Sequence, residues 1–237
     1  MNILLLRLES PLLAFGGVMV DAYGFTDDIP SASLLTGLLG NALGYRRSDH
    51  AQLQALQDRL RYAVRIDRSG QRITDYQTAD LNKDDAGWTT RGTPEGRAGG
   101  AGTYEGQHQR YRDYHADAAV TVALTLAPVE GGGEGAPNVA ALAEALQQPA
   151  RPLFIGRKPC LPSSPLLLGM VEAESVEQAV RLAPLADAAD ARPRLYRQLA
   201  QPEGARSLGL HGRRNWRANV HQGREWWSMQ YMENVDA

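Results

Sequence analysis

Five side chains could act as general acids or bases. They are two tyrosines and three histidines: Tyr45, His50, His108, Tyr111 and His115. General acid–base catalysis needs one group that accepts a proton and a second group that donates one. Each of these histidines is more simply interpreted as a surface residue.

The sequence lacks the other common catalytic motifs. It contains no HExxH zinc motif, no GxSxG nucleophile elbow, no GxxxxGK[ST] phosphate loop and no GxGxxG after a strand. The single cysteine, Cys160, excludes an internal disulfide and a thiolate zinc cluster, and we expect it to be a packed side chain. We predict no metal site and no cofactor.

Cationic side chains gather in two places, although the net charge of the chain is −2. Gly156-Arg157-Lys158 directly follows a predicted strand, so a backbone without a Cβ lies next to two cations that could neutralise phosphates. Residues 192–224 hold eight arginines against one acid, a local charge of +7, with aromatic residues interleaved. This combination favours an anionic partner such as single-stranded nucleic acid. The alternatives are an exposed charged turn and a solvated basic surface.

A third candidate anion site is the start of a predicted helix. Ser31 or Ser33 can cap this helix, and residues 30–34 could offer unpaired N–H groups to a phosphate. Gly37 and Gly40 inside the same helix cost about 1 kcal/mol each relative to alanine. They also allow a second interpretation, which is close packing of the helix on a sheet.

The remaining pattern indicates one large domain or a compact pair of domains, with an apolar fraction of 43% in 237 residues. No apolar run reaches the roughly 18–20 residues that a membrane span needs, and residues 1–8 form a strand pattern, not an export signal. We therefore expect a cytoplasmic protein without a membrane partner.

The order of predicted elements indicates an α+β fold. Strands at 2–9 and 62–67 flank two helices, a turn at 68–70 leads into 71–78, and strand character resumes at 116–127. A helix from 138 and a short strand at 153–155 complete a ferredoxin-like β-α-β-β-α-β order, with helices on one sheet face and the other face free. Seven glycines between residues 87 and 106 indicate a long loop.

Taken together, these segments resemble the CasD-type subunits of Cascade, the bacterial CRISPR surveillance complex, which belong to the repeat-associated RAMP proteins. The matching segments follow one another over about three quarters of the chain: 4–8, 10–11, 15–16, 30–44, 47–49, 53–56, 63–67, 75–76, 114–118, 152–160, 165–166 and 224–226. The family usually has Trp where Phe15 stands, and a Thr-Lys/Arg-Ser sequence at positions 31–33. The missing cation leaves hydroxyls and backbone amides as the donors there.

The resemblance implies a fold and a function. The fold would be a ferredoxin-like (RRM-like) RAMP body formed by residues 1–78 and 111–175, a long glycine-rich thumb loop at 79–110 and a β-rich C-terminal extension at 176–237. The function would be to bind the 5′ handle of the guide RNA (crRNA) and to cap the filament of backbone subunits, without catalysis. A related branch of the RAMP proteins cuts repeat RNA without a metal, so the alternative is an endoribonuclease that processes CRISPR repeat RNA with the five acid–base residues named above. Such an enzyme needs a general base for the 2′-hydroxyl, an acid for the leaving 5′-oxygen and a cation for the phosphorane. The implied partners are the crRNA handle, the backbone subunits (through the thumb), the large subunit and, only through the complex, target DNA.

Thirteen residues are the candidate RNA contacts under this interpretation. They are Phe15, Gly16, Ser31, Ser33, Thr36, Arg46, Arg47, Gly156, Arg157, Lys158, Arg213, Arg214 and Arg217.

Overall fold

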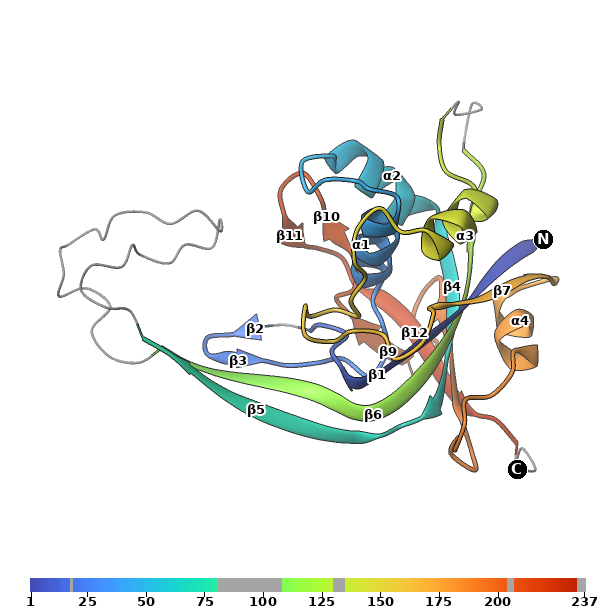
Figure 1. The fold of residues 1–237 in the computed structure, drawn as a ribbon. Helices are drawn as coiled ribbons and strands as arrows, with labels where there is room; N and C mark the ends of the chain where they lie inside the picture. Colours follow the sequence, from blue (N-terminus) through green and yellow to red (C-terminus); the bar gives the residue numbers. More distant parts are fainter. Residues whose placement is uncertain (18, 81–107, 130–134, 204–206, 234–237) are drawn as a thin grey trace.

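The computed structural model describes residues 1–17, 19–80, 108–129, 135–203 and 207–233, and it has a mixed α+β architecture (Figure 1). The helices are α1 (Ala32–Ala42), α2 (His50–Arg59), α3 (Val139–Gln147) and α4 (Val176–Leu182). The strands are β1 (Asn2–Leu13), β2 (Met19–Val20), β3 (Tyr23–Gly24), β4 (Leu60–Arg68), β5 (Gln71–Ala79), β6 (His108–Leu126), β7 (Leu167–Glu172), β8 (Arg194–Leu199), β9 (Ser207–Leu210), β10 (Arg214–Asn215), β11 (Val220–His221) and β12 (Glu225–Tyr231).

Four strands form the centre of the sheet in the order β7-β1-β6-β4, and each neighbouring pair is antiparallel. In sequence order, the last of these four strands is β7. The segment that we predicted to be this strand, residues 153–155, is irregular chain instead. That segment is too short for a strand ladder, and it closes a tight turn in which the Ile155 N–H donates to the Cys160 carbonyl at 2.8 Å. Cys160 is fully buried, which confirms its prediction as a packed side chain.

Alternate residues of the central strands form the larger core. Leu4, Leu6 and Leu8 of β1 lie on the same face as Val120 and Val122 of β6, and α1 and α3 cover them. The helix α1 begins as predicted at Ser31, whose hydroxyl accepts from the Leu34 N–H. Its hydrophobic spacing therefore turns one side of the helix into the sheet.

The opposite face of the sheet is covered as well, so the prediction that it is free was wrong. Ile3, Leu5 and Ala123 pack there against Val180 of α4, and the chain after α4 continues across the face. α4 therefore lies on the other side of the central strands from α1 and α3 (Figure 1).

The C-terminal strands enlarge the same sheet. Antiparallel to β4 lies β8, and β12 and β9 follow in turn, while β10 and β11 form a separate two-stranded hairpin. The predicted C-terminal extension is therefore β-rich, but it is continuous with the central sheet.

β5 and the first part of β6 form a long arm that leaves the rest of the sheet, and the short strand β3 pairs with β6 along it (Figure 1). β4 and β5 pair with successive parts of β6, so residues 68–70 do not reverse the chain as a hairpin turn would. Strand structure also begins at residue 108 and not at 116, because Gln71 to Ala79 pair with Ala116 to His108. Most of the predicted thumb loop, residues 81–107, lies outside the described residues.

Candidate nucleic-acid interface

A cleft of about 350 Å³ lies between the loop after β1, the start of α1, the loop before β7 and the β10–β11 hairpin. These four segments are far apart in the sequence. The cleft is lined by Ala14, Phe15, Gly16, Gly17, Asp27, Ser31, Ser33, Leu34, Gly37, Leu38, Asn41, Phe154, Gly156, Arg157, His211, Arg214, Trp216 and His221.

The structure brings most of the candidate RNA contacts to this cleft or to its neighbour. Seven line the cleft itself: Phe15, Gly16, Ser31, Ser33, Gly156, Arg157 and Arg214. A second, larger groove of about 1010 Å³ runs between α2 and the β10–β11 hairpin, where Arg213 and Arg217 join Arg214. Arg214 lines both hollows and so connects them. The other four, Thr36, Arg46, Arg47 and Lys158, are not among the lining residues.

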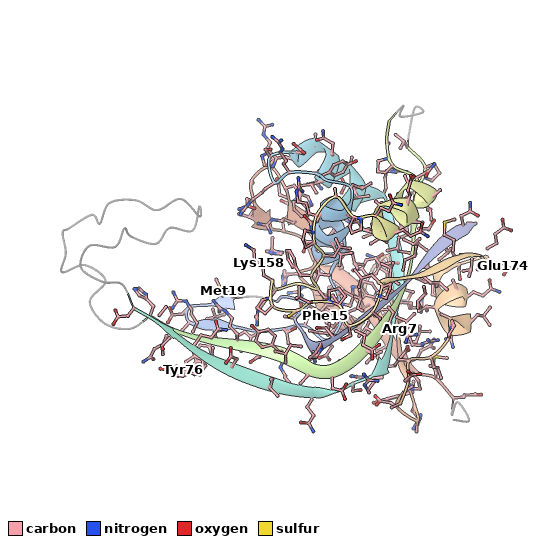
Figure 2. The ribbon with its side chains drawn as sticks, viewed as in Figure 1. Arg7, Phe15, Met19, Tyr76, Lys158 and Glu174 are labelled. Carbon is pink, nitrogen blue, oxygen red and sulfur yellow. The ribbon has the colours of Figure 1, made fainter. Side chains whose placement is uncertain are left out.

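The loop after β1 is pinned to the chain that leads into α1. The Phe15 N–H donates to the Thr26 hydroxyl at 2.9 Å, and the Asp27 N–H donates to the Gly16 carbonyl at 2.5 Å. Only 2% of Phe15 is exposed, and its ring centroid lies 5.6 Å from that of His115. Phe15 therefore supports the wall of the cleft, and little of its ring is open to a ligand. Figure 2 places it at the centre of the molecule.

Gly156 is required by its own conformation and by its neighbour. Its φ is +86°, and a Cβ at this position would overlap the carbonyl oxygen of Ala14. The backbone of this loop therefore lies directly against the end of β1. This contact forms one wall of the cleft.

The first turn of α1 does not offer free N–H groups, so that part of the prediction was wrong. The Ser33 N–H donates to the Gly212 carbonyl at 2.9 Å, and the Leu34 N–H donates to the Ser31 hydroxyl at 3.3 Å. The Ala32 N–H faces the buried carboxyl group of Glu225, and its hydrogen bond favours the charged form of that group. The helix start is thus paired with the protein's own C-terminal region.

Thr36, another candidate, lies in the core. Its side chain has no exposed surface, and its hydroxyl oxygen has no hydrogen-bond partner within the described part of the chain. Arg46 and Arg47 are exposed just before α2. Arg47 lies near enough to Arg214 to lower the pKa of that guanidinium, after the larger effect of burial.

An arginine and a tryptophan form the wall opposite α1. The guanidinium carbon of Arg214 lies 5.4 Å from the ring centroid of Trp216, and the indole passes 3.8 Å from the position of a Cβ on Gly37. Gln57 of α2 fixes this hairpin, because its side chain donates to the Arg214 carbonyl at 2.8 Å and accepts from the Arg214 N–H at 3.1 Å. The indole nitrogen of Trp216 is buried without a hydrogen-bond partner among the described residues.

Arg157 lines the cleft and also forms hydrogen bonds with two other segments of the chain. Its guanidinium donates to the Asp113 carbonyl at 2.8 Å and to the Gly24 carbonyl at 2.9 Å, and it lies 4.7 Å from the ring centroid of Tyr114. A guanidinium has five N–H donors, so these two bonds leave capacity for a ligand. Lys158 is exposed, on the side of the body towards the arm (Figure 2).

Sequence reasoning did not select three titratable residues of the cleft, namely Asp27, His211 and His221. Burial and Asp28 raise the pKa of Asp27, while Arg72 and His211 lower it. Burial and Arg214 lower the pKa of His221, which favours the neutral imidazole at neutral pH. No local signal marks these residues, because the fold alone brings residue 27 next to residues 211–221.

The five residues of the ribonuclease hypothesis do not form one site. His50 lines the larger groove, Tyr45 packs against the main core, and His108 and Tyr111 lie on the arm. The His115 ring is 9% exposed and lies 3.0 Å through Nε2 from the Asp27 carbonyl oxygen. Across the described ranges, no three His, Cys, Asp or Glu side chains are grouped to hold a metal ion. No helix in those ranges is long and apolar enough to cross a membrane.

The chain is similar to proteins of CRISPR systems. Residues 3–226 match the model of the family described as CRISPR-associated protein (Cas_Cas5). The CRISPR system Cascade subunit CasD of Escherichia coli (strain K12) is 32% identical over 186 residues, which are 75% of either chain. A chain in a solved CRISPR RNA-guided surveillance complex is 27% identical, with a TM-score of 0.72 over 98% of this chain and 90% of that one. A crystal structure of a Cas protein, 22% identical, has a similar fold, with a TM-score of 0.61 over 98% and 95% of the two chains.

Proposed function

Because this chain belongs to the CRISPR-associated Cas_Cas5 family, we propose that it is the Cascade subunit that binds the 5′ handle of the guide RNA. The observation that carries the proposal is the pair of connected hollows beside α1 and α2. Arg213, Arg214 and Arg217 line the groove, and Arg214 also lines the cleft together with Trp216. Guanidinium groups bind phosphates, and an indole beside them can stack on an unpaired base.

The fold supports the same proposal. The four central strands have the order β7-β1-β6-β4, and all neighbours are antiparallel. We propose that these strands and their helices are a ferredoxin-like RAMP body. A hooked single strand needs local cations for its phosphates and flat surfaces for its splayed bases. The cleft and the groove supply both kinds of group on one side of the molecule.

We also propose that the arm caps the filament of backbone subunits. β5 and the first part of β6 extend from the body, and every residue of β5 is exposed, so the arm can contact neighbouring protein. The large subunit would contact the assembled complex, and target DNA would be recognised through base pairing with the guide. We expect this assembly in the cytoplasm.

A non-catalytic role is favoured by the separation of the five acid–base candidates. General acid and general base must both lie within hydrogen-bond reach of one scissile phosphodiester. His115 is buried next to Phe15, His108 and Tyr111 lie on the arm, and His50 begins α2, so these candidates do not meet this condition together.

The test is binding of a fluorescent handle RNA to the full chain, measured by anisotropy at several salt concentrations. Arg214→Ala and Trp216→Ala should each weaken binding by about tenfold. Only Arg214→Ala should reduce the salt slope, by about 0.7. Arg181→Ala, which removes an exposed cation from α4, is the matched control. Equal affinity of wild type and both variants for the handle would overturn the proposal.

A further inference from the structure

Two arginines from distant parts of the chain meet over a glycine part of the way along the arm. Arg112 lies on β6 and Arg157 on the loop before β7, and Gly24 ends β3 between them. A Cβ on Gly24 would lie 2.6 Å from Nη1 of Arg112 and 3.2 Å from Nη2 of Arg157. The missing side chain at Gly24 thus leaves room for both guanidinium groups.

The groups that hold these arginines in place are neutral. Arg157 is bound by the carbonyl oxygens of Gly24 and Asp113 and lies on the Tyr114 ring. Nη1 of Arg112 lies 3.7 Å from the Met19 sulfur atom. Carbonyl, sulfur and ring contacts fix the positions of the two side chains without cancelling their charge.

No carboxylate of the described chain forms an ion pair with either arginine within 4.0 Å. The carboxylate of Asp113 is engaged elsewhere, by Arg72 at 3.1 Å and by the Thr74 hydroxyl at 2.8 Å. Burial lowers the pKa of Arg112, and the charges of Arg157 and Arg110 lower it further. Asp75 stands opposite Arg112 on β5, but its carboxylate accepts from the Gln77 side chain and forms no ion pair with Arg112. A cluster of like charges without an ion-pair partner in the described part of the chain is stabilised when an anion binds.

Arg110 extends the cluster along the arm. It lies two residues from Arg112 on β6, so both side chains leave the same face of the strand, from Cα atoms about 6.8 Å apart. This separation is close to that of successive phosphates in an extended single strand. At the other end, Arg157 lines the cleft. The three arginines therefore form a line that starts at the cleft and follows the arm outwards.

We propose that this line is a phosphate track for the guide strand. Arg112 and Arg157 hold one phosphate over Gly24, and Arg110 holds the next phosphate further out. The RNA leaves the handle cleft along this face of the arm. The inference rests on the proposed function, and it adds a path for the nucleotides that follow the handle. Arginine forks and continuity with the cleft favour RNA over a carboxylate of a neighbouring protein.

The experiment compares two RNAs, the handle alone and the handle followed by several guide nucleotides. Arg112→Ala should weaken binding of the longer RNA by about tenfold, and it should reduce its salt slope by about 0.7. Arg110→Ala should act in the same direction. Both variants should bind the handle alone as wild type does. Arg112→Lys, which keeps the charge, should preserve the salt slope, and Arg181→Ala is the control for charge alone.

The possible failures are distinguishable. A wild-type chain that does not bind the handle contradicts the proposed function. If the handle binds but Arg112→Ala and Arg110→Ala leave the affinity and slope of the longer RNA unchanged, the phosphate track is wrong. If the Arg112→Ala and Arg110→Ala variants no longer bind a neighbouring subunit but still bind RNA as wild type does, the arginines bind a carboxylate of that subunit. This result would also overturn the inference. Thermal melting of each variant separates local loss of binding from unfolding, and Arg112→Lys provides a folded comparison.

Discussion

The guanidinium of Arg65 and the carboxylate of Asp67 form a fully buried ion pair, with Nε and Oδ1 2.5 Å apart. Asp67 also accepts from the Thr121 hydroxyl at 2.7 Å and from the Ala186 N–H at 3.0 Å. Arg65 donates to the carbonyl oxygens of Val180, Ala183 and Pro184. The pair therefore ties the end of α4 and the following chain to the sheet.

Removing the acid of this pair should strongly destabilise the fold. Asp67→Ala leaves Arg65 and the neighbouring Arg7 buried without their anion, which should lower the free energy of unfolding by about 3–5 kcal/mol. Urea denaturation measures this change. The matched control is Glu203→Ala, which breaks an exposed ion pair with Arg197 and should cost about 1 kcal/mol or less. If both substitutions lowered the free energy of unfolding equally, Asp67 would not be the buried anion that stabilises Arg65.

Two glycines of the cleft should respond in opposite ways to alanine. Gly156→Ala places a Cβ against the Ala14 carbonyl oxygen at a positive φ, so the free energy of unfolding should fall by about 1–3 kcal/mol. Gly37→Ala meets only the Trp216 ring, at 3.8 Å, and should stabilise α1 by up to about 1 kcal/mol. The melting temperatures of both variants, compared with wild type, measure these two changes in stability. A stable Gly156→Ala protein would show that the loop is not held against β1.

The buried acid Glu225 should make stability depend on pH. Burial raises the pKa of Glu225 above its ordinary value of 4.5, although Arg213, the Ala32 N–H and Gln198 act in the other direction. The folded state then holds this proton more tightly than the unfolded state does. Its contribution is fully present below pH 4.5 and is lost as the pH rises through the raised pKa.

Glu225→Gln tests this dependence because glutamine cannot release a proton. The unfolding free energy of Glu225→Gln relative to wild type should increase as the pH rises from 4.5, and then level off. Denaturation curves at a series of pH values measure it, with Glu203→Gln as the exposed control. A difference that does not change with pH would mean that the pKa of Glu225 is the same in both states.

The purified chain should leave repeat RNA intact in EDTA. The five candidate acid and base groups are divided among the start of α2, the main core and β6, and they do not form one site. Denaturing gels of labelled repeat RNA are the measurement, with wild type, His50→Ala and His115→Ala side by side. Specific cleavage by wild type that disappears in either variant would restore the ribonuclease hypothesis.

Much of the central fold could be predicted because its signals are local. Alternation at 62–67, the Ser31 cap and the spacing of leucines in α1 each depend on residues a few positions apart. The arm was harder to predict, because residues 108–115 are polar and form a strand through pairing with β5 and β3. The covered second face was also missed, since a short helix and a buried ion pair carry no periodic signal.

The amino-acid sequence alone determined the family, the order of the main strands and helices, and the excess of arginine in the C-terminal third. Only the tertiary structure decided which of those arginines share a surface, that the first N–H groups of α1 are already paired, and that Arg112 and Arg157 meet over Gly24. The reason is physical. A strand or helix follows from neighbouring residues, whereas a binding surface is made by segments up to about two hundred residues apart, which only the packed core holds together.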